Sequence, residues 1–490
     1  MTRLRNYTFD EITIGQTARY SKTVEERDIQ LFAAVSGDVN PVHLDAGFAA
    51  GTRFGERIAH GMLTGALISA ALAMELPGPG TIYLGQSLRF RLPVHLGDTV
   101  TVELEVTATG ERRTTVTLAC RAVNQAGKLV ASGVAEVMGN KTQRYILREP
   151  MGVMGAITPW NVPNDINLKK LGWAMAAGCT VVMKAAPSTS WCSNFLGEVI
   201  ATKTDVPAGA VNILSSSEND IGELITNDRR VDLVGFTGST AVGKRILEVC
   251  APQVKPAQLE LGGKSAAMLM PDMPGLPQVA GAMAASVCFH AGQGCAILTR
   301  LLVPKSELDA CADAAKEAMS NVAYGDPFDP ENIMGPLNSA IQRERVEGHI
   351  QQAISDGAKL VVGGGRPKQF DKGYFIEPTA FIAHEDSALA QNEVFGPVQT
   401  IIGYEDEADM IRIANNSRYG LSGAIMGPDV EKALEVASQI RTGTLSVCGG
   451  GYYNWDVPFG GYKESGSGRE HGDVGYEEHL ESKTIAVPAQ

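Results

Sequence analysis

GVMGAITPW, at residues 152–160, is the first of five short apolar runs that decide the fold of the larger part of this chain. The other four are TVVMK (180–184), VNILS (211–215), VDLVGFTGS (231–239) and QLELGG (258–263). The segment between each pair of runs is long enough for one helix. Strand-like runs that alternate with helical segments are typical of βαβ units, in which the strands form a mostly parallel sheet covered by helices. The chain after residue 148 is therefore predicted to have an α/β fold.

The part of the chain before residue 139 has a different pattern. Val, Thr and Leu dominate four successive runs that are separated by glycine-containing turns, at 81–94, 98–109, 112–124 and 128–138. Upstream, GMLTGALISAALAMEL (61–76) is apolar nearly all round, as a buried helix is. We therefore predict an α+β domain in which an antiparallel sheet wraps round this helix. The polar and basic segment 139–150 is predicted to be the linker to the α/β part.

Composition excludes several classes of partner. The 490 residues carry a formal net charge of −13, whereas nucleic acids and membrane surfaces attract basic proteins. None of the eight cysteines forms a CxxC pair or fits a zinc-site spacing, so we expect free thiols in a reducing cytoplasm and no metal site. We find no apolar leader and no apolar run of about 18 residues, and therefore expect no signal peptide and no membrane span.

Four segments of the α/β part carry residues that suit one chemistry. GAITPWN ends in Asn161, and GFTGSTAVG (235–243) has Gly238 and Gly243 around a predicted helix start. LELGGKS carries Glu260, and GQGCAILTR carries Cys295. Taken singly, each has a plainer explanation: a buried thiol, a paired structural carboxylate, a turn asparagine and an ordinary helix start.

Together these residues fit the oxidation of an aldehyde. A thiolate attacks the aldehyde carbon, a hydride leaves to a nicotinamide, and the resulting thioester is hydrolysed. The attack creates an oxyanion that an asparagine amide and a backbone N–H can stabilise. Hydrolysis needs a carboxylate that activates water. A glycine-rich helix start permits the close approach of a pyrophosphate.

From about Glu149 to the C-terminus the sequence resembles the aldehyde dehydrogenase superfamily. The motifs that carry the resemblance are ITPWN, FTGST, LELGGKS, GQGC, NEVFGPV (392–398) and PFGGYKESGSGRE (458–470). It implies a Rossmann-like cofactor domain with an α/β catalytic domain, and it assigns Cys295 as nucleophile and Glu260 as general base. Asn161, with the Cys295 N–H, would form the oxyanion hole. The cofactor contacts that the resemblance implies are Ile157, Trp160, Lys184, Gly238, Ser239, Gly243, Glu393 and Phe395.

Two departures from the family pattern have consequences. Many members carry an acidic residue three places after the lysine, where it binds a ribose hydroxyl and favours NAD. Pro187 stands at that place here, so we expect NAD, with NADP as an alternative. The family's first quarter, which supplies one wall of the aldehyde tunnel, has no counterpart in the resemblance. We therefore expect exposed apolar surface and unpaired strand edges, unless a partner subunit or the N-terminal domain covers them.

The segment SGDVNPVHLD (36–45) carries a second candidate site. Asp38 and His43 lie five residues apart, and IAHGM follows at 58–62. Hydration of an activated double bond needs a water held between two polar groups, one of which removes its proton while another proton is delivered to carbon. From the spacing alone, a loop in which Asp, Asn and Pro form turns explains the segment equally simply.

Residues 7–138 resemble the MaoC-like hot-dog family, and closely the (R)-specific enoyl-CoA hydratases. GDVNPVHLD, IAHGMLTGALIS and GPGTIYLGQSLRFRLPVHLGD carry this resemblance. It implies that Asp38 and His43 are the catalytic pair, that Ser69 is a supporting polar residue, and that the backbone at Gly61 faces the thioester carbonyl. Family members pair as dimers, and their CoA-ester site uses both subunits.

The sequence thus predicts four parts: a hot-dog domain (1–140), an NAD(P)-binding domain (141–262), a catalytic domain (263–450) and a segment that returns to the cofactor domain and supplies an oligomerisation strand (451–490). We predict a cytoplasmic homo-oligomer that oxidises an aldehyde at Cys295 and hydrates a 2-enoyl-CoA at Asp38 and His43. One alternative is that only the hydratase works and the shortened dehydrogenase part is a scaffold. Another is that the hot-dog part only binds acyl-CoA or mediates dimerisation.

Overall fold

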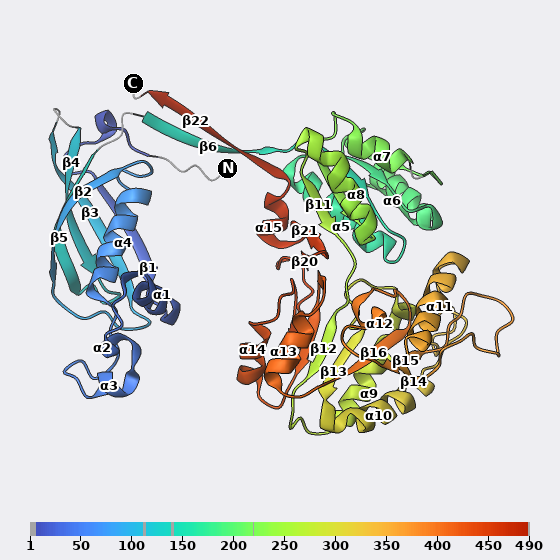
Figure 1. Cartoon of the computed structure of the whole chain (residues 1–490). Helices are drawn as coiled ribbons and strands as arrows, with labels where there is room; N and C mark the ends of the chain where they lie inside the picture. The colour runs from blue at the N-terminus through green and yellow to red at the C-terminus, as the bar shows by residue number, and fades with distance from the viewer. Residues whose placement is uncertain (1–5, 111–113, 139–141, 219, 489–490) are drawn as a thin grey trace. The chain divides into compact units, whose positions relative to one another are not determined.

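The computed structural model describes residues 6–110, 114–138, 142–218 and 220–488 (Figure 1). The chain divides into two compact units. Unit 1 comprises Met1–Glu149 with Ser482–Gln490, and unit 2 comprises Pro150–Glu481. Each unit has its own hydrophobic core.

Unit 1 is built on a five-stranded antiparallel sheet with the order β1-β3-β4-β5-β2. Its strands are β1 (Thr17–Thr23), β2 (Ile82–Phe90), β3 (Thr99–Gly110), β4 (Thr115–Val123) and β5 (Leu129–Met138). The four predicted strands are confirmed as β2 to β5, although Arg112 and Arg113 of the third lie outside the described residues. β1 was not predicted, because its sequence TARYSKT has few apolar residues. In β3, Val100, Val102 and Leu104 alternate with less buried residues, so one face of the sheet meets the core.

The predicted helix of unit 1 is α4 (Gly61–Met74). It packs against β1, β2, β3 and β4, and Leu67, Ile68 and Leu72 lie in the shared core. The sheet therefore curls round one central helix, as the apolar sequence of that helix indicated. The other helical segments of this unit are η1 (Phe9–Glu11), α1 (Glu26–Ser36), α2 (Pro41–Leu44) and α3 (Ala46–Ala50).

The segment predicted as a linker is a strand in the structure. β6 (Thr142–Pro150) pairs with β22 (Leu480–Pro488), so residues 142–150 of the predicted linker form a strand, and the boundary between the two units falls at its end, between Glu149 and Pro150. Residues 139–141 lie outside the described part. The local sequence is largely polar, but Tyr145 and Ile146 favour a strand, and the C-terminal segment offers it a hydrogen-bonding edge.

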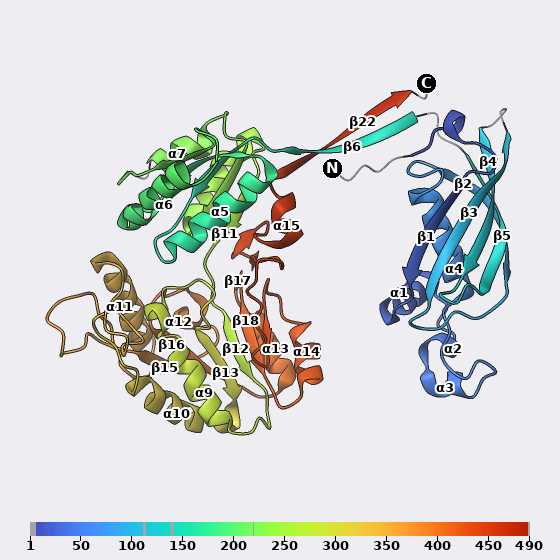
Figure 2. The ribbon, with the colours of Figure 1, turned by 180° about the vertical axis from the view of Figure 1, so that it is seen from behind.

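The first sheet of unit 2 has the order β21-β11-β10-β7-β8-β9 and is parallel except for β21. Figure 2 shows its strand β11 among the helices that flank the sheet. Its strands are β7 (Val153–Ile157), β8 (Thr180–Lys184), β9 (Val211–Leu214), β10 (Leu233–Thr237), β11 (Ala257–Glu260) and β21 (Gly466–Ser467). The connecting helical segments are α5 (Pro163–Ala177), η3 (Pro187–Thr189), α6 (Ser190–Lys203), α7 (Asp220–Asn227), α8 (Thr240–Cys250) and η4 (Ala251–Gln253). Because these strands are parallel and in register, Ile157, Lys184 and Glu260 all lie at the same edge of the sheet.

The second sheet of unit 2 has the order β14-β15-β16-β13-β12-β18-β19. Its strands are β12 (Ala266–Leu269), β13 (Arg300–Pro304), β14 (Lys359–Val362), β15 (Thr379–Ile382), β16 (Val398–Tyr404), β18 (Gly423–Met426) and β19 (Ser446–Val447). Its helices cover both faces, because Leu301 and Val303 of β13 enter one core while Leu302 enters another. This double burial explains the nearly continuous apolar sequence of the strand.

The remaining elements of unit 2 complete this arrangement. They are α9 (Leu276–Ser286), η5 (Phe289–Gly292), η6 (Lys305–Glu307), α10 (Leu308–Ser320), α11 (Ala340–Ser355), α12 (Ala388–Gln391), α13 (Glu407–Asn415), β17 (Tyr419–Gly420), α14 (Val430–Ala437), β20 (Tyr462–Lys463) and α15 (Gly472–Glu477). β17 pairs with β20, and β21 joins the first sheet beside β11. The C-terminal segment thus returns to the first sheet of this unit.

Unit 2 exposes apolar groups beside one edge of its first sheet. β9 is an edge strand of that sheet. On the neighbouring helix α6, Trp191 is 87% exposed and Phe195 is 67% exposed. Both observations agree with the expectation that a chain without a counterpart of the family's first quarter exposes apolar surface and an unpaired strand edge. In the described part of the chain, no helix combines the length and the apolar character needed to span a membrane.

Candidate active sites

A cavity of about 270 Å³ opens in unit 2 at the carboxyl ends of β10 and β11. Eight of the predicted site residues line it: Trp160, Asn161, Gly238, Ser239, Glu260, Cys295, Glu393 and Phe395. Three predicted cofactor contacts do not line it. Ile157 and Lys184 end the neighbouring strands β7 and β8, and Gly243 lies one turn inside α8.

The loop that carries Cys295 is fixed on two sides. The Asn161 side-chain amide donates to the carbonyl of Gln293 at 3.0 Å, and His290 Nε2 donates to the carbonyl of Asn161 at 2.7 Å. The Gln293 side chain in turn accepts from the backbone N–H of Asn338 at 2.8 Å. An amide group has two N–H bonds, so Asn161 keeps one for another acceptor. Gln293 was not predicted, although it lies inside the quoted GQGC motif.

Cys295 and Glu260, the predicted nucleophile and the predicted base, both lie where their charged forms are disfavoured. Burial raises the pKa of the Cys295 thiol to about 12, and the nearby carboxyls of Glu393 and Glu260 act in the same direction. Burial also raises the pKa of Glu260 well above its usual range, and the carboxylate of Glu470 adds to this shift. Both carboxyl oxygens of Glu260 are buried without a hydrogen-bond partner among the described residues. Such displaced titrations are characteristic of groups that exchange protons during catalysis.

Two lysines of α5 connect Glu260 to the C-terminal motif. Lys170 forms a buried ion pair of 2.6 Å with Glu470. Lys169 forms an ion pair of 2.7 Å with Asp165. Both lysines lower the pKa of Glu260, in opposition to burial and to Glu470. None of these four partners was predicted, because consecutive lysines in a helix normally indicate a solvated face.

The start of α8 lies against the end of β11. Ser239 caps the helix by accepting from the N–H of Val242 at 3.4 Å, and the N–H of Gly238 donates to the carbonyl of Glu260 at 3.0 Å. A side chain at Gly243 would bring its Cβ within 2.5 Å of the Leu261 side chain, so only glycine permits this packing. The helix therefore presents its free N–H groups at the cavity, as anion-binding helix starts do.

Glu393 and Phe395 form the opposite wall of the cavity. Glu393 accepts from the N–H of Gly263 at 2.9 Å, and burial raises its pKa to about 7. Phe395 has a φ of +56°, and its carbonyl accepts from the Gln342 side chain at 2.8 Å. Its ring lies edge-on to Trp160, with 5.6 Å between centroids. The backbone of Phe395 is thus held in a conformation that non-glycine residues rarely adopt.

Three residues of α11 also line the cavity and were not predicted. Gln342, Arg345 and His349 lie three and four positions apart, so they share one face of the helix. This helical spacing of polar residues was the signal in the sequence. It was not recognised because the rest of α11 is also polar.

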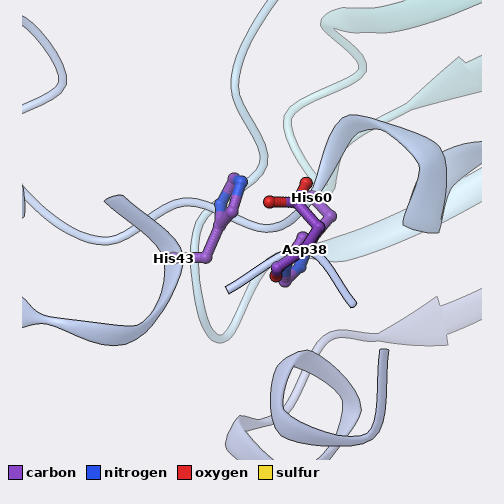
Figure 3. Close-up of side chains that lie close together, drawn as sticks. All are labelled: Asp38, His43 and His60. Atoms are coloured by element: carbon purple, nitrogen blue, oxygen red, sulfur yellow. The ribbon is translucent and has the colours of Figure 1, made fainter. Parts of the chain in front are cut away.

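Unit 1 brings Asp38 and His43 together with a histidine that was not predicted, His60 (Figure 3). His43 is buried and its Nδ1 donates to the carbonyl of Ile58 at 2.7 Å. His60 is also buried and its Nε2 donates to the backbone carbonyl of Asp38 at 2.8 Å. The two imidazole rings lie 3.9 Å apart between centroids. His60 belongs to the quoted IAHGM segment, which offered the only signal for it.

A cavity of about 280 Å³ lies beside this cluster. His43, His60, Gly61, Phe90 and two arginines, Arg53 and Arg91, are among the residues that line it. Asp38 itself is exposed and does not line it, and Ser69 is half-buried in α4, about two turns beyond Gly61. The structure therefore joins Asp38, His43 and Gly61 in one region, while Ser69 lies apart from the cavity.

Comparisons with known proteins agree with both halves of this description. The aldehyde dehydrogenase family matches residues 99–485, and the MaoC like domain matches residues 10–126. The two matches overlap at 99–126, a range that contains β3 and β4 of the sheet in unit 1. The chain is 40% identical over 342 residues to 3-succinoylsemialdehyde-pyridine dehydrogenase of a Pseudomonas species, which covers 69% of this chain and 71% of that protein.

Solved structures give the same result. An aldehyde dehydrogenase of Mycobacterium tuberculosis complexed with NAD+ is 42% identical, with a TM-score of 0.68 and 71% of each chain covered. A betaine aldehyde dehydrogenase of Staphylococcus aureus in complex with NAD+ is 36% identical, with a TM-score of 0.69, and the match covers 71% of this chain and 70% of that chain. The chain belongs to the aldehyde dehydrogenase family and carries an N-terminal MaoC-like domain.

Proposed function

We propose that unit 2 oxidises an aldehyde to a carboxylic acid through a thioester on Cys295, and that unit 1 hydrates a 2-enoyl-CoA at Asp38 and His43. The observation that carries the first part is the convergence of Cys295, Glu260 and Asn161 on one cavity. A protein that served only as a scaffold would need none of these groups in contact with a cavity. The family membership supports the same activity.

The first step is the attack of Cys295 on the aldehyde carbon. At neutral pH the thiol carries its proton, because its pKa is raised to about 12. Glu260 accepts that proton more readily than an ordinary carboxylate would, because burial raises its own pKa as well. The free N–H of the Asn161 amide and the backbone N–H of Cys295 stabilise the oxyanion that forms.

The residues at the carboxyl edge of the first sheet fit NAD. The N–H groups at the start of α8 suit a pyrophosphate, and the buried Thr237 hydroxyl has no hydrogen-bond partner among the described residues. Lys184 would hold the adenosine ribose and Glu393 the nicotinamide ribose. When bound, NAD accepts the hydride that leaves the thiohemiacetal carbon. NADP is the alternative cofactor, because Pro187 supplies no carboxylate that would exclude its phosphate.

Glu260 then activates the water that hydrolyses the thioester. Once its first proton has passed to solvent, Glu260 accepts a proton from water and the hydroxide adds to the acyl carbon. Cys295 then departs as a thiolate and takes this proton back from Glu260, which restores the starting state. The test of this activity is the formation of NADH or NADPH with a panel of aldehydes, with Cys295→Ala as the control. A variant that forms as much reduced cofactor as the wild type would refute the role of Cys295.

The hydratase proposal rests on which ring nitrogen of His43 donates a hydrogen bond and on the residues that line the adjoining cavity. His43 uses its Nδ1–H to bind Ile58, so its Nε2 keeps a lone pair that can accept a proton from water. The adjoining cavity combines the apolar ring of Phe90 with the cationic groups of Arg53 and Arg91. This combination suits an acyl chain attached to a phosphate-bearing carrier such as CoA.

The corresponding assay follows the loss of the enoyl absorbance of crotonyl-CoA. We expect Asp38→Asn to abolish hydration while leaving aldehyde oxidation intact. Hydration at the wild-type rate by this variant would contradict the assignment. Crotonyl-CoA serves as a generic probe, because the cavity alone does not specify the acyl chain.

We also propose that the chain forms a homo-oligomer. β2 is an edge strand of the sheet in unit 1, and it exposes Ile82 (56%), Leu84 (46%) and Phe90 (50%). An apolar edge of this kind pairs readily with the same edge of another copy. Phe90 also lines the cavity beside His43, so such pairing would bring a second subunit next to the site.

A further inference from the structure

His60 occupies a central position in unit 1 that the proposed reaction does not yet use. Its side chain is only 2% exposed. The ring lies between that of Phe32, at 5.1 Å, and that of His43, at 3.9 Å between centroids. Its Nε2 is 2.8 Å from the backbone carbonyl of Asp38. His60 therefore contacts both members of the catalytic pair.

The hydrogen bonds define the proton positions on both histidines. A carbonyl oxygen only accepts, so His60 must donate from Nε2 and His43 must donate from Nδ1. In the neutral imidazoles, the lone pairs are then on Nδ1 of His60 and Nε2 of His43. Nδ1 of His60 is buried and has no hydrogen-bond partner among the described residues. A buried acceptor without a partner is unfavourable, so a water molecule that reaches this nitrogen would stabilise it.

The spacing of the cluster fits one shared water molecule. Asp38 offers a carboxylate oxygen and His43 and His60 each offer one ring nitrogen, and these three atoms lie within 4.8 Å of one another (Figure 3). Two partners that are each about 2.8 Å from a tetrahedral oxygen are about 4.6 Å apart. Buried waters typically make about three hydrogen bonds. One water can therefore reach all three side chains.

We propose that His60 is a third catalytic group of the hydratase site, and that its Nδ1 holds the same water as Asp38 and His43. This inference rests on the proposed hydratase function and adds to it. His60 also positions Asp38, because its Nε2–H binds the backbone of that residue. The backbone bond and the water bond use opposite sides of one imidazole.

A count of protons explains why three groups suit the reaction better than two. The water has two hydrogens and faces three acceptors, so one of the three groups must carry an additional proton. During hydration, the oxygen lone pair forms the bond to Cβ, and one water proton passes to an unprotonated member of the cluster. The π electrons of the double bond form the new Cα–H bond with the additional proton. A proton shift within the cluster restores the starting state after the product leaves.

Two substitutions of His60 separate this role from a packing role. His60→Leu retains bulk but has no polar atom, whereas His60→Gln retains a donor and an acceptor side by side. We expect His60→Leu to lower kcat for crotonyl-CoA by about 100-fold with little change in KM. His60→Gln should recover most of the lost kcat. His95→Leu, the same replacement at a histidine outside the cluster, should retain wild-type kinetics.

Thermal unfolding of each variant shows whether unit 1 is folded. A folded His60→Leu protein with wild-type kcat, or a folded His60→Gln protein as slow as His60→Leu, would overturn the inference. Loss of hydration on treatment with a chelator would overturn it too, because the cluster would then hold an ion in place of the water. If the wild type does not hydrate crotonyl-CoA at all, the proposed hydratase function fails, and this inference fails with it.

Discussion

At the scale of single residues, Glu260 depends on two neighbours of opposite charge. Glu470 raises its pKa and Lys170 lowers it, although the two form an ion pair with each other. The pair therefore acts as a dipole beside the base. Removal of either partner should move the titration of Glu260 in a known direction.

We predict opposite shifts of the pH profile of aldehyde oxidation for two substitutions. Glu470→Gln removes the like charge and lowers the pKa of Glu260, so the rise of kcat with pH should occur at lower pH. Lys170→Met removes the cation, raises that pKa further and should shift the rise to higher pH. Each change leaves a buried group unpaired and costs about 3–5 kcal/mol of stability. The position of the rise does not depend on the folded fraction, so shifts in the same direction would contradict the prediction.

A second residue-scale prediction concerns Gly263. A Cβ at this position would lie 2.4 Å from the carbonyl oxygen of Cys295. Gly263→Ala must therefore displace the loop that carries Cys295, and a displacement of about 1 Å can lower the rate of the proposed oxidation about 100-fold. Gly172→Ala is the matched control, because its Cβ would meet no atom within 4 Å. Equal kcat values for the two variants would show that the loop does not need this close approach.

At the scale of secondary-structure elements, the sequence predicts those strands whose positions depend on the local residue pattern alone. The strands β7, β8, β9, β10 and β11 follow apolar runs, so their carboxyl ends and the residues there, such as Glu260, are predictable. β1 and β6 are polar strands whose formation depends on a partner strand, which local pattern does not reveal. Tertiary packing brings His349 and His60 to their sites. In the sequence, neither their residue type nor their spacing from neighbouring polar residues sets them apart from ordinary surface or core histidines.

The mouth of the unit 1 cavity offers an element-scale prediction. Arg53, in the segment after α3, and Arg91, directly after β2, line the cavity and form no ion pair among the described residues. If they bind the phosphates of CoA, Arg53→Gln and Arg91→Gln should each raise KM for crotonyl-CoA about tenfold. KM for crotonyl-pantetheine, which lacks the phosphates, should not change. Arg121→Gln, at an exposed arginine of β4, is the control. An equal effect on both thioesters would exclude phosphate recognition.

At the scale of the whole molecule, the exposed edge of β2 leads to a prediction about assembly. We expect light scattering to give a mass that is a multiple of the chain mass. Leu84→Lys places a charge on the apolar edge and should shift the protein toward the monomer. Ile14→Lys alters another exposed apolar residue of unit 1, outside β2, and should have no effect. A wild-type monomer, or a Leu84→Lys protein of unchanged mass, would contradict the proposed interface.

The central claim is that Cys295 carries the acyl group during aldehyde oxidation. Mass spectrometry of the intact protein, quenched with acid during turnover of an aldehyde with NAD+, tests it most directly. We expect an adduct with the mass of the acyl group, located on the peptide that contains Cys295 and absent from Cys295→Ala. Formation of NADH with no adduct on that peptide, or an adduct that persists in Cys295→Ala, would contradict it.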